Sequence, residues 1–205
     1  MPALLWRERT VFTCALPPRP PYFSAKEYLQ IEAQSPIKHE YIDGRLYAMV
    51  GVSEAHNLIA GNLITLLRNH LRGSGCRVFF SGMKVRIEAR NRFYYPDVLV
   101  TWDERDRDRD TLHFKRFPKL IVEILSDSTE AFDRGDKFED YQSLESLREY
   151  VLVSSKRPLV QCFRRTDARL WVLQSYTGEQ ESFELLSLDL LAPLAALYED
   201  VSLLG

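Results

Sequence analysis

The chain has 205 residues, of which 45% are hydrophobic and 27% are charged, and its formal net charge is −2. This length and composition are typical of a globular protein that needs no disulfide or structural metal to fold. The slightly acidic balance argues against a general grip on nucleic acid through excess Lys and Arg, although it allows a local basic face. Cys14, Cys76 and Cys162 lie far apart, so they indicate reduced thiols of a cytoplasmic protein rather than a zinc site.

The N-terminal end of the chain differs in composition from the rest. Prolines crowd positions 17–21, and proline disrupts helices and central strands. We therefore expect an N-terminal tail over residues 1–21, followed by a single domain over residues 22–205. The apolar runs are short, and the first arginines follow the N-terminal apolar residues, an order unlike that of a secretion signal. The sequence thus predicts neither a membrane span nor export.

The first elements of the domain have clear boundary signals. Ser24 with Glu27 three residues later is a capping box, which predicts a helix that ends before Pro36. Asp43-Gly44 lies between two β-prone runs and predicts a hairpin with strands at 38–42 and 45–50. Ser53 precedes apolar residues at helical spacing, which predicts a longer helix.

Beyond Gly73 the hydrophobic period changes to two, which is typical of strands. The alternating charges at 103–110 predict a solvated loop or short helix, with a mobile lid as the alternative. A helix is expected from residue 133 or 135 to 143, and the apolar stretch 190–198 has helical spacing and is expected to dock on the body. The expected strands are Cys76–Phe80, Lys84–Glu88, Phe93–Trp102 with an interruption at Pro96, Lys119–Leu125, Glu149–Ser154, Leu159–Arg164 and Leu170–Gln174. This order predicts an α/β (α+β) protein with a mixed sheet.

Glu123 is the most informative residue, because it is a carboxylate in the middle of an apolar strand. Burying a carboxylate is costly unless it is paired or bound to a metal. Side chains alternate along a strand, so Ile121 and Leu125 share a face with Glu123. The alternative is an edge glutamate that pairs with a nearby arginine.

Asp97 is the second candidate, because it follows Pro96 at the head of another hydrophobic strand. Alone, it is equally compatible with a turn residue that caps backbone amides. Asp97 and Glu123 together predict two carboxylates on neighbouring strands that share one Mg²⁺ ion, which binds few carboxylates and keeps several waters. A metal at this place would activate a water and stabilise charge on a phosphoryl oxygen.

Several short motifs occur in the order found in a known family, over residues 22–201. They are His39–Gly44, Ala55–Asn57, Tyr95–Val98, Val122–Ser126, Asp133–Phe138 with Tyr141, and Glu149–Val153. The chain resembles the restriction-endonuclease-like domain that is abundant in cyanobacteria and is often classed as a domain of unknown function. That family belongs to the PD-(D/E)XK nuclease superfamily. The resemblance implies a mixed central sheet flanked by helices, with an N-terminal β-hairpin.

The resemblance also implies where the family's catalytic motif lies. Its Pro-Asp matches Pro96-Asp97, and its (D/E)-x-K matches Glu123-Ile124-Leu125, except that Leu125 stands at the lysine position. Similar sequences place the lysine on the following helix, which makes Lys137 the substitute and Lys84 the alternative. Lys137 lies four residues after Asp133, and the simpler interpretation of this spacing is a surface ion pair.

Further roles follow from the resemblance. Asp97, Glu123 and the backbone carbonyl of Ile124 would hold Mg²⁺ or Mn²⁺. Glu40, from the hairpin, would add a ligand or a supporting contact. His56 is a candidate contact to metal or phosphate, although a lone histidine is more often structural, and Lys84 is a candidate contact to the substrate phosphate. Tyr141 is expected in the core.

The expected activity is hydrolysis of phosphodiester bonds in nucleic acid, with DNA as the substrate. A homodimer is expected, because two-fold symmetry matches that of duplex DNA. The alternative is a catalytically inactive module that keeps the nuclease fold and binds a partner protein or nucleic acid. The missing strand lysine and the acidic pI favour this alternative.

Overall fold

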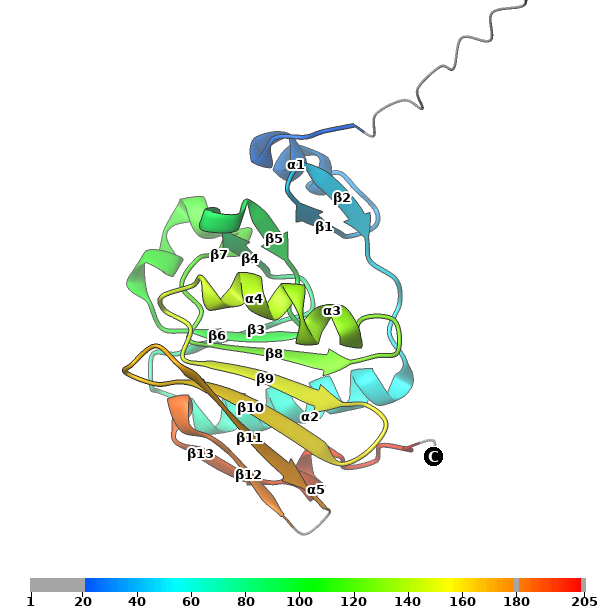
Figure 1. The fold of residues 1–205 in the computed structure, drawn as a ribbon, viewed down its shortest axis with the longest axis vertical. Coiled ribbons are helices and arrows are strands. Elements are labelled where there is room, and N and C mark those ends of the chain that lie inside the picture. Colours follow the sequence, from blue (N-terminus) through cyan, green and yellow to red (C-terminus); the bar gives the residue numbers. More distant parts are fainter. Residues whose placement is uncertain (1–20, 179–180, 204–205) are drawn as a thin grey trace, which may run out of the picture.

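The computed structural model describes residues 21–178 and 181–203, which form two β-sheets with packed helices and a C-terminal strand pair (Figure 1). The expected architecture, a mixed sheet flanked by helices with an N-terminal hairpin, is confirmed. The expected tail over 1–21 lies outside the described residues, apart from Pro21. Within the described ranges, no helix has the length and apolar character needed to cross a bilayer.

The larger sheet has six strands and forms the centre of the molecule. In spatial order they are β11 (Trp171–Thr177), β10 (Leu159–Arg165), β9 (Glu149–Ser154), β8 (Leu120–Leu125), β6 (Val98–Thr101) and β3 (Arg77–Phe80). β8 and β9 run parallel, and the other neighbours are antiparallel. All residues of β8 are buried, as expected for a nearly continuous apolar strand covered on both faces.

The second sheet has five strands and carries the N-terminal hairpin. In spatial order they are β2 (Arg45–Ala48), β1 (His39–Ile42), β5 (Arg92–Tyr94), β4 (Lys84–Ile87) and β7 (Phe114–Lys115). The hairpin turn is Asp43-Gly44, with φ values of 45° and 85°. A tight two-residue turn needs this left-handed backbone at both positions, so the hairpin predicted from the dipeptide is confirmed. β12 (Ser182–Leu185) and β13 (Leu190–Pro193) pair separately.

Helices cover both faces of the six-stranded sheet. On one face lie α2 (Glu54–His70) and α5 (Leu194–Leu197), and on the other lie α3 (Glu130–Arg134) and α4 (Asp136–Gln142), whereas α1 (Ala25–Glu32) packs against β1 and β5 of the second sheet. Ser24 and Glu27 form the predicted capping box of α1, and Ser53 caps α2. α2 crosses behind the sheet in Figure 1 and packs Leu63 and Leu67 against one face, while α4 covers the opposite face.

The expected strand Phe93–Trp102 is instead two strands in different sheets. β5 pairs with β1 and β4, whereas β6 pairs with β3 and β8. Pro96 lies at the break, because it has no N–H to donate to a strand ladder. Asp97 therefore stands where the chain passes from one sheet to the other.

Two further expectations are wrong in part. The charge run at 103–110 forms short 3₁₀ helices, as expected, but it is not solvated throughout, since Asp106 is buried. The Asp106 carboxylate accepts hydrogen bonds from Thr101 Oγ1 at 2.9 Å and from two backbone amides, which compensates its burial. The C-terminal stretch docks on the core as expected, but residues 190–193 form strand β13 and the helix covers 194–197.

The buried carboxylate of Glu149 ties the C-terminal segment to the central sheet. It accepts hydrogen bonds from Arg164 Nε at 3.0 Å and from the backbone amides of Leu186 and Ser187. We predict that Arg164→Ala lowers the free energy of unfolding by about 3 kcal/mol, because a buried charge loses its cation. Urea denaturation measures this loss, with the exposed Arg157→Ala as control. Equal losses in the two variants would contradict the prediction.

Candidate active site

The pairing of β6 with β8 places the two candidate acids side by side. Val98 lies opposite Val122, and Leu99 lies opposite Ile121, so the next position along the pair brings Asp97 to Glu123. Opposed side chains of an antiparallel pair point to the same face of the sheet. That face is the one beneath α4, because Leu99 and Ile121 belong to the core that α4 covers.

Two hydrogen bonds hold the carboxylate of Asp97. Its Oδ1 lies 2.9 Å from Nε2 of His56, and its Oδ2 accepts the backbone N–H of Ile124 at 2.7 Å. His56 comes from the first turn of α2, which Ser53 caps. Asp97 therefore does accept a hydrogen bond from a backbone amide, as expected for a turn residue. The amide belongs to Ile124 of β8, however, and not to the turn that contains Asp97.

Glu123 is 3% exposed and lies beside the buried ammonium of Lys137. Nζ of Lys137 is 3.0 Å from Oε1 of Glu123. It is also 3.2 Å from Oε1 of Glu40 and 3.4 Å from Oδ1 of Asp133. Burial raises the pKa of Glu123 well above its ordinary value. Burial alone would lower the pKa of Lys137, but the three carboxylates outweigh it and raise this pKa well above its ordinary value, so the ammonium stays charged.

The Asp133–Lys137 pair is therefore not the surface pair that its spacing suggests. Both side chains are nearly buried. The single helix expected from residue 133 or 135 is two helices, because the backbone of Gly135 leaves helical values with φ −109° and ψ −105°. A Cβ at Gly135 would lie 3.1 Å from the carbonyl oxygen of Ala131, so glycine suits this tight joint between α3 and α4.

These groups line a cavity of about 240 Å³. Its charged lining residues are four carboxylates and one lysine, namely Glu40, Asp97, Glu123, Asp133 and Lys137. Ionised together, they leave three negative charges in excess. A concave site with such an excess favours the entry of a cation.

The donors in the cavity fit Mg²⁺ or Mn²⁺, which prefer carboxylate and carbonyl oxygens. The N–H of Ile124 faces Asp97, and the carbonyl of a strand residue points to the same side as its N–H. Among residues 21–178 and 181–203, no three His, Cys, Asp or Glu side chains are grouped as a ready metal cage. A bound ion would therefore depend on Asp97, Glu123, this carbonyl and several waters.

Comparison with known proteins identifies the family. Residues 25–196 match the model of the Uma2 family, described as "Putative restriction endonuclease". The chain belongs to the Uma2 family. Two Synechocystis relatives are the "uncharacterized protein slr1290", with 39% identity over 89% of this chain and 94% of the relative, and sll1609, with 32% identity over 78% and 91%. The resemblance seen in the motifs is confirmed.

A solved structure supports the fold of this Uma2 protein. A crystal structure described as a "putative nuclease belonging to DUF820" from Anabaena variabilis has a TM-score of 0.71 over 86% of this chain and 97% of that chain. The two sequences are 14% identical, so the likeness shows the fold alone. Chemistry has to be argued from the site itself.

Lys84 does not face the Uma2 cavity. Its Nζ donates a hydrogen bond to the hydroxyl of Tyr95 at 3.1 Å, and that hydroxyl donates to Glu32 at 2.7 Å. Burial lowers the pKa of Lys84. Tyr95 lines the cavity and Lys84 does not. Lys84 thus holds Tyr95, a lining residue of the cavity, and Lys137 is the lysine beside Glu123.

Two residues join the Uma2 site although sequence reasoning gave them no part in it. Asp133 contacts the ammonium of Lys137, and Tyr141 donates its hydroxyl to Oε1 of Glu123 at 3.1 Å. Tyr141 is fully buried, as expected, but it is also a polar partner. Asp133, Lys137 and Tyr141 recur every four residues, a spacing that would place them on one face of a continuous helix. That spacing is the signal that could have found them.

We predict that Lys137→Met lowers the free energy of unfolding by about 3 kcal/mol at neutral pH without added metal, because buried carboxylates lose their cation. The loss should shrink as the pH falls toward about 5, because Glu123, whose pKa burial raises, then binds a proton in the folded state and needs no ammonium. Denaturation at a series of pH values measures both effects.

Lys156→Met is the matched control. Lys156 also pairs with an aspartate, Asp127, but both side chains are mostly exposed, and such pairs add little stability. A Lys137 effect no larger than this control, or one that grows toward acidic pH, would show that the cluster is not a buried ionic network.

Proposed function

We propose that the protein is a nuclease that hydrolyses phosphodiester bonds of DNA with Mg²⁺ or Mn²⁺ as cofactor. The observation that carries this proposal is the placement of Asp97 and Glu123 on one face of adjoining strands, in a cavity that also holds the ammonium of Lys137. The description of the Uma2 family points to the same chemistry.

Asp97, Glu123 and the carbonyl of Ile124 are the groups that would hold the metal. A divalent cation, when bound there, supplies Lewis acidity toward a phosphoryl oxygen and lowers the pKa of a water. The chain fixes the donors in advance, because His56 and the amide of Ile124 engage both oxygens of Asp97. Such contacts orient a ligand and tune its affinity, so His56 acts through Asp97 rather than on the phosphate.

Lys137 fills the role that Leu125 cannot. Leu125 is buried in the core, whereas Lys137 reaches Glu123 from α4. Because the pKa of Lys137 is raised well above its ordinary value, its ammonium is a hydrogen-bond donor and not a general base. It positions the attacking water and stabilises developing negative charge. Glu40 and Asp133 hold it in place.

An inactive module with the nuclease fold is the second candidate function. One observation favours it: the three carboxylates of Glu40, Glu123 and Asp133 already surround the ammonium of Lys137. A lysine has three N–H donors, so one contact must open before a water can be held. Calorimetric titration separates the candidates, because a nuclease binds Mg²⁺ or Mn²⁺ at millimolar concentration or below and the inactive module does not.

We predict metal-dependent cleavage of plasmid or single-stranded DNA that EDTA stops. Asp97→Asn and Glu123→Gln should each lower kcat/KM by about a hundredfold or more, because each variant keeps the side-chain size and removes one negative charge from the metal donors. Gel assays with the purified protein measure this loss. Asp127→Asn is the control, since Asp127 follows β8 closely but is 78% exposed. Cleavage that survives both active-site substitutions would remove the assignment.

We predict that Mn²⁺ binds more tightly as the pH rises. Burial raises the pKa of Glu123, so a proton and the metal compete for this carboxylate, and the proton leaves at higher pH. Calorimetry across about pH 6 to 8 follows the change. Glu123→Gln should bind weakly at every pH and show a smaller dependence. A wild-type affinity that is constant over this range would contradict the prediction.

The homodimer also stays a prediction. β11 is an edge strand, and Val172 and Leu173 on it are exposed. An exposed edge of this kind can pair with a second copy. Light scattering at micromolar concentration should give twice the mass of one chain, and the mass of a single chain would contradict it.

A further inference from the structure

A groove leads from the candidate active site along the edge of the six-stranded sheet. It begins beside Asp97 as a cavity of about 490 Å³, which Gly61 of α2 and Phe80 of β3 help to line. It continues as a cavity of about 670 Å³, which Arg68 of α2 and Arg77 of β3 help to line. The two cavities meet at consecutive residues on both walls, so they form one α2–β3 groove.

Both walls of the α2–β3 groove start at the active site. The N–H of Ser81, just after β3, donates to the carbonyl of Asp97 at 3.3 Å, and His56 in the first turn of α2 contacts the Asp97 carboxylate. From His56 to Arg68 the helix rises about 18 Å. This length equals about five steps of a nucleic-acid strand at 3.4 Å per step.

The far end of the groove is basic. Arg68, Arg72 and Arg77 line it, and no acidic residue does. All three are exposed, and within the described part of the chain none of them forms a salt bridge. In a chain with a net charge of −2, three free guanidinium groups together are a local excess of positive charge. Arginine suits phosphate because its donors match two phosphate oxygens at once.

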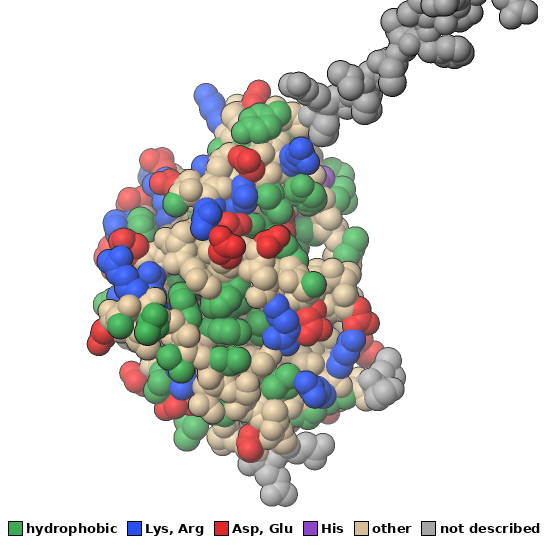
Figure 2. Space-filling model, viewed as in Figure 1, with side chains coloured by type: hydrophobic (Ala, Val, Ile, Leu, Met, Phe, Trp, Pro, Cys, Tyr) green, Lys and Arg blue, Asp and Glu red, His purple; other side chains and the backbone are tan. Residues whose placement is uncertain are grey.

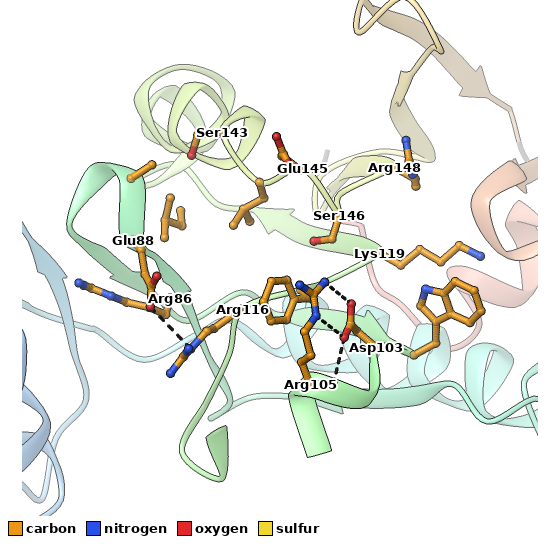
Figure 3. Close-up of a pocket in the computed structure, with 15 residues that line it drawn as sticks. Arg86, Glu88, Asp103, Arg105, Arg116, Lys119, Ser143, Glu145, Ser146 and Arg148 are labelled. Carbon is orange, nitrogen blue, oxygen red and sulfur yellow. Dashed lines mark hydrogen bonds and ion pairs between the residues drawn. The ribbon is translucent and has the colours of Figure 1, made fainter. Parts of the chain in front are cut away.

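A second basic cavity, shown in Figure 3, is less suited to phosphate. Its volume is about 520 Å³, but two of its four arginines already face carboxylates, and Glu88, Asp103 and Glu145 line it as well. Arg105 pairs with Asp103 at 2.7 Å, and Arg116 Nε lies 3.7 Å from Glu88. This cavity is lined by Lys119, which precedes the first residue of β8, whereas Glu123 lies in the second half of that strand. It is therefore not continuous with the candidate active site.

The molecular face that carries α4 is not suited to binding a nucleic-acid backbone. Asp136 and Glu139 are exposed there, and Figure 2 shows Asp and Glu side chains gathered around α4. Like charge would repel a phosphate backbone on this face. Along the α2–β3 groove, in contrast, the charged side chains beyond Asp97 are Lys38 and the three arginines.

We propose that the α2–β3 groove binds the sugar–phosphate backbone of the strand that leads away from the cleavage position. Arg68, Arg72 and Arg77 would hold neighbouring phosphates about five nucleotides from that position; this role rests on the proposed nuclease function. Gly61 keeps the groove open. It lies inside a helix, where glycine lowers stability, yet a Cβ built on it meets no atom within 4 Å, so packing does not require it.

Anisotropy of a labelled single-stranded oligonucleotide of about 20 nucleotides, measured in EDTA, tests this role without any cleavage. We expect Arg68→Ala/Arg72→Ala to weaken binding about tenfold or more and to reduce the slope of log affinity against log salt by about 1.4, since each lost contact to a single strand removes about 0.7. Gly61→Leu should weaken binding similarly by filling the groove, with no change in charge. Its thermal unfolding should occur at or above the wild-type temperature.

The control is Lys119→Ala/Arg148→Ala, which removes two charges from the cavity of Figure 3. Equal losses in the control and in the arginine variant would overturn the proposal, as would unchanged binding in both groove variants. Polyglutamate that competes as well as the oligonucleotide at equal charge would instead assign the groove to an acidic protein segment and would also overturn it.

The binding assay also separates failure of the groove from failure of the nuclease. If the groove variants lose binding while no metal supports cleavage, the groove stands and the nuclease function fails. If the wild type cleaves DNA and the groove variants bind and cleave it equally well, the nuclease function stands and the groove fails.

Discussion

The buried carboxylate of Glu123 is the constraint on which the rest of the site depends. A glutamate inside an apolar strand is stable only when other groups replace the water that it loses. Here those groups come from separate elements: Lys137 and Tyr141 from α4 contact it directly, and Glu40 from β1 and Asp133 from α3 hold the ammonium. The hairpin, the two short helices and the central strand must therefore adopt one arrangement around a shared charge network. The atoms that stabilise this arrangement are also those that could do chemistry.

Asp97 and Glu123, the two candidate metal ligands, differ in how far their side chains are exposed to solvent. The side chain of Asp97 is 23% exposed and stands at the break between the two sheets, whereas that of Glu123 is 4% exposed and lies beneath α4. Asp97 is thus the carboxylate that a hydrated ion meets first, and Glu123, whose pKa is raised, is the one for which a proton competes with the ion. His56 and Asp97 line both the acidic cavity and the first part of the α2–β3 groove. Bond cleavage and strand binding would then share one boundary, at the head of β6.

Local signals in the sequence predicted the local parts of this structure. Ser24, Ser53 and Asp43-Gly44 defined their elements because caps and tight turns depend on neighbouring residues alone. The division of Phe93–Trp102 between two sheets was missed, because strand partners lie far along the chain and override local pattern. The spacing of Asp133 and Lys137 indicated that the two side chains are neighbours, but neither the break between α3 and α4 at Gly135 nor their burial, which follows from the packing of α3 and α4 on β8. The apolar strands around Asp97 and Glu123, and then the family motif, singled out these two carboxylates, while the partners that fix them required the fold.

Anomalous diffraction from crystals soaked in Mn²⁺ tests most directly whether Asp97 and Glu123 form one cation site. We expect one strong peak about 2.2 Å from an oxygen of each carboxylate, with the carbonyl of Ile124 beside it and the ammonium of Lys137 still in contact with Glu123. No peak between these carboxylates at saturating Mn²⁺, or a peak bound elsewhere alone, would contradict the proposed metal centre.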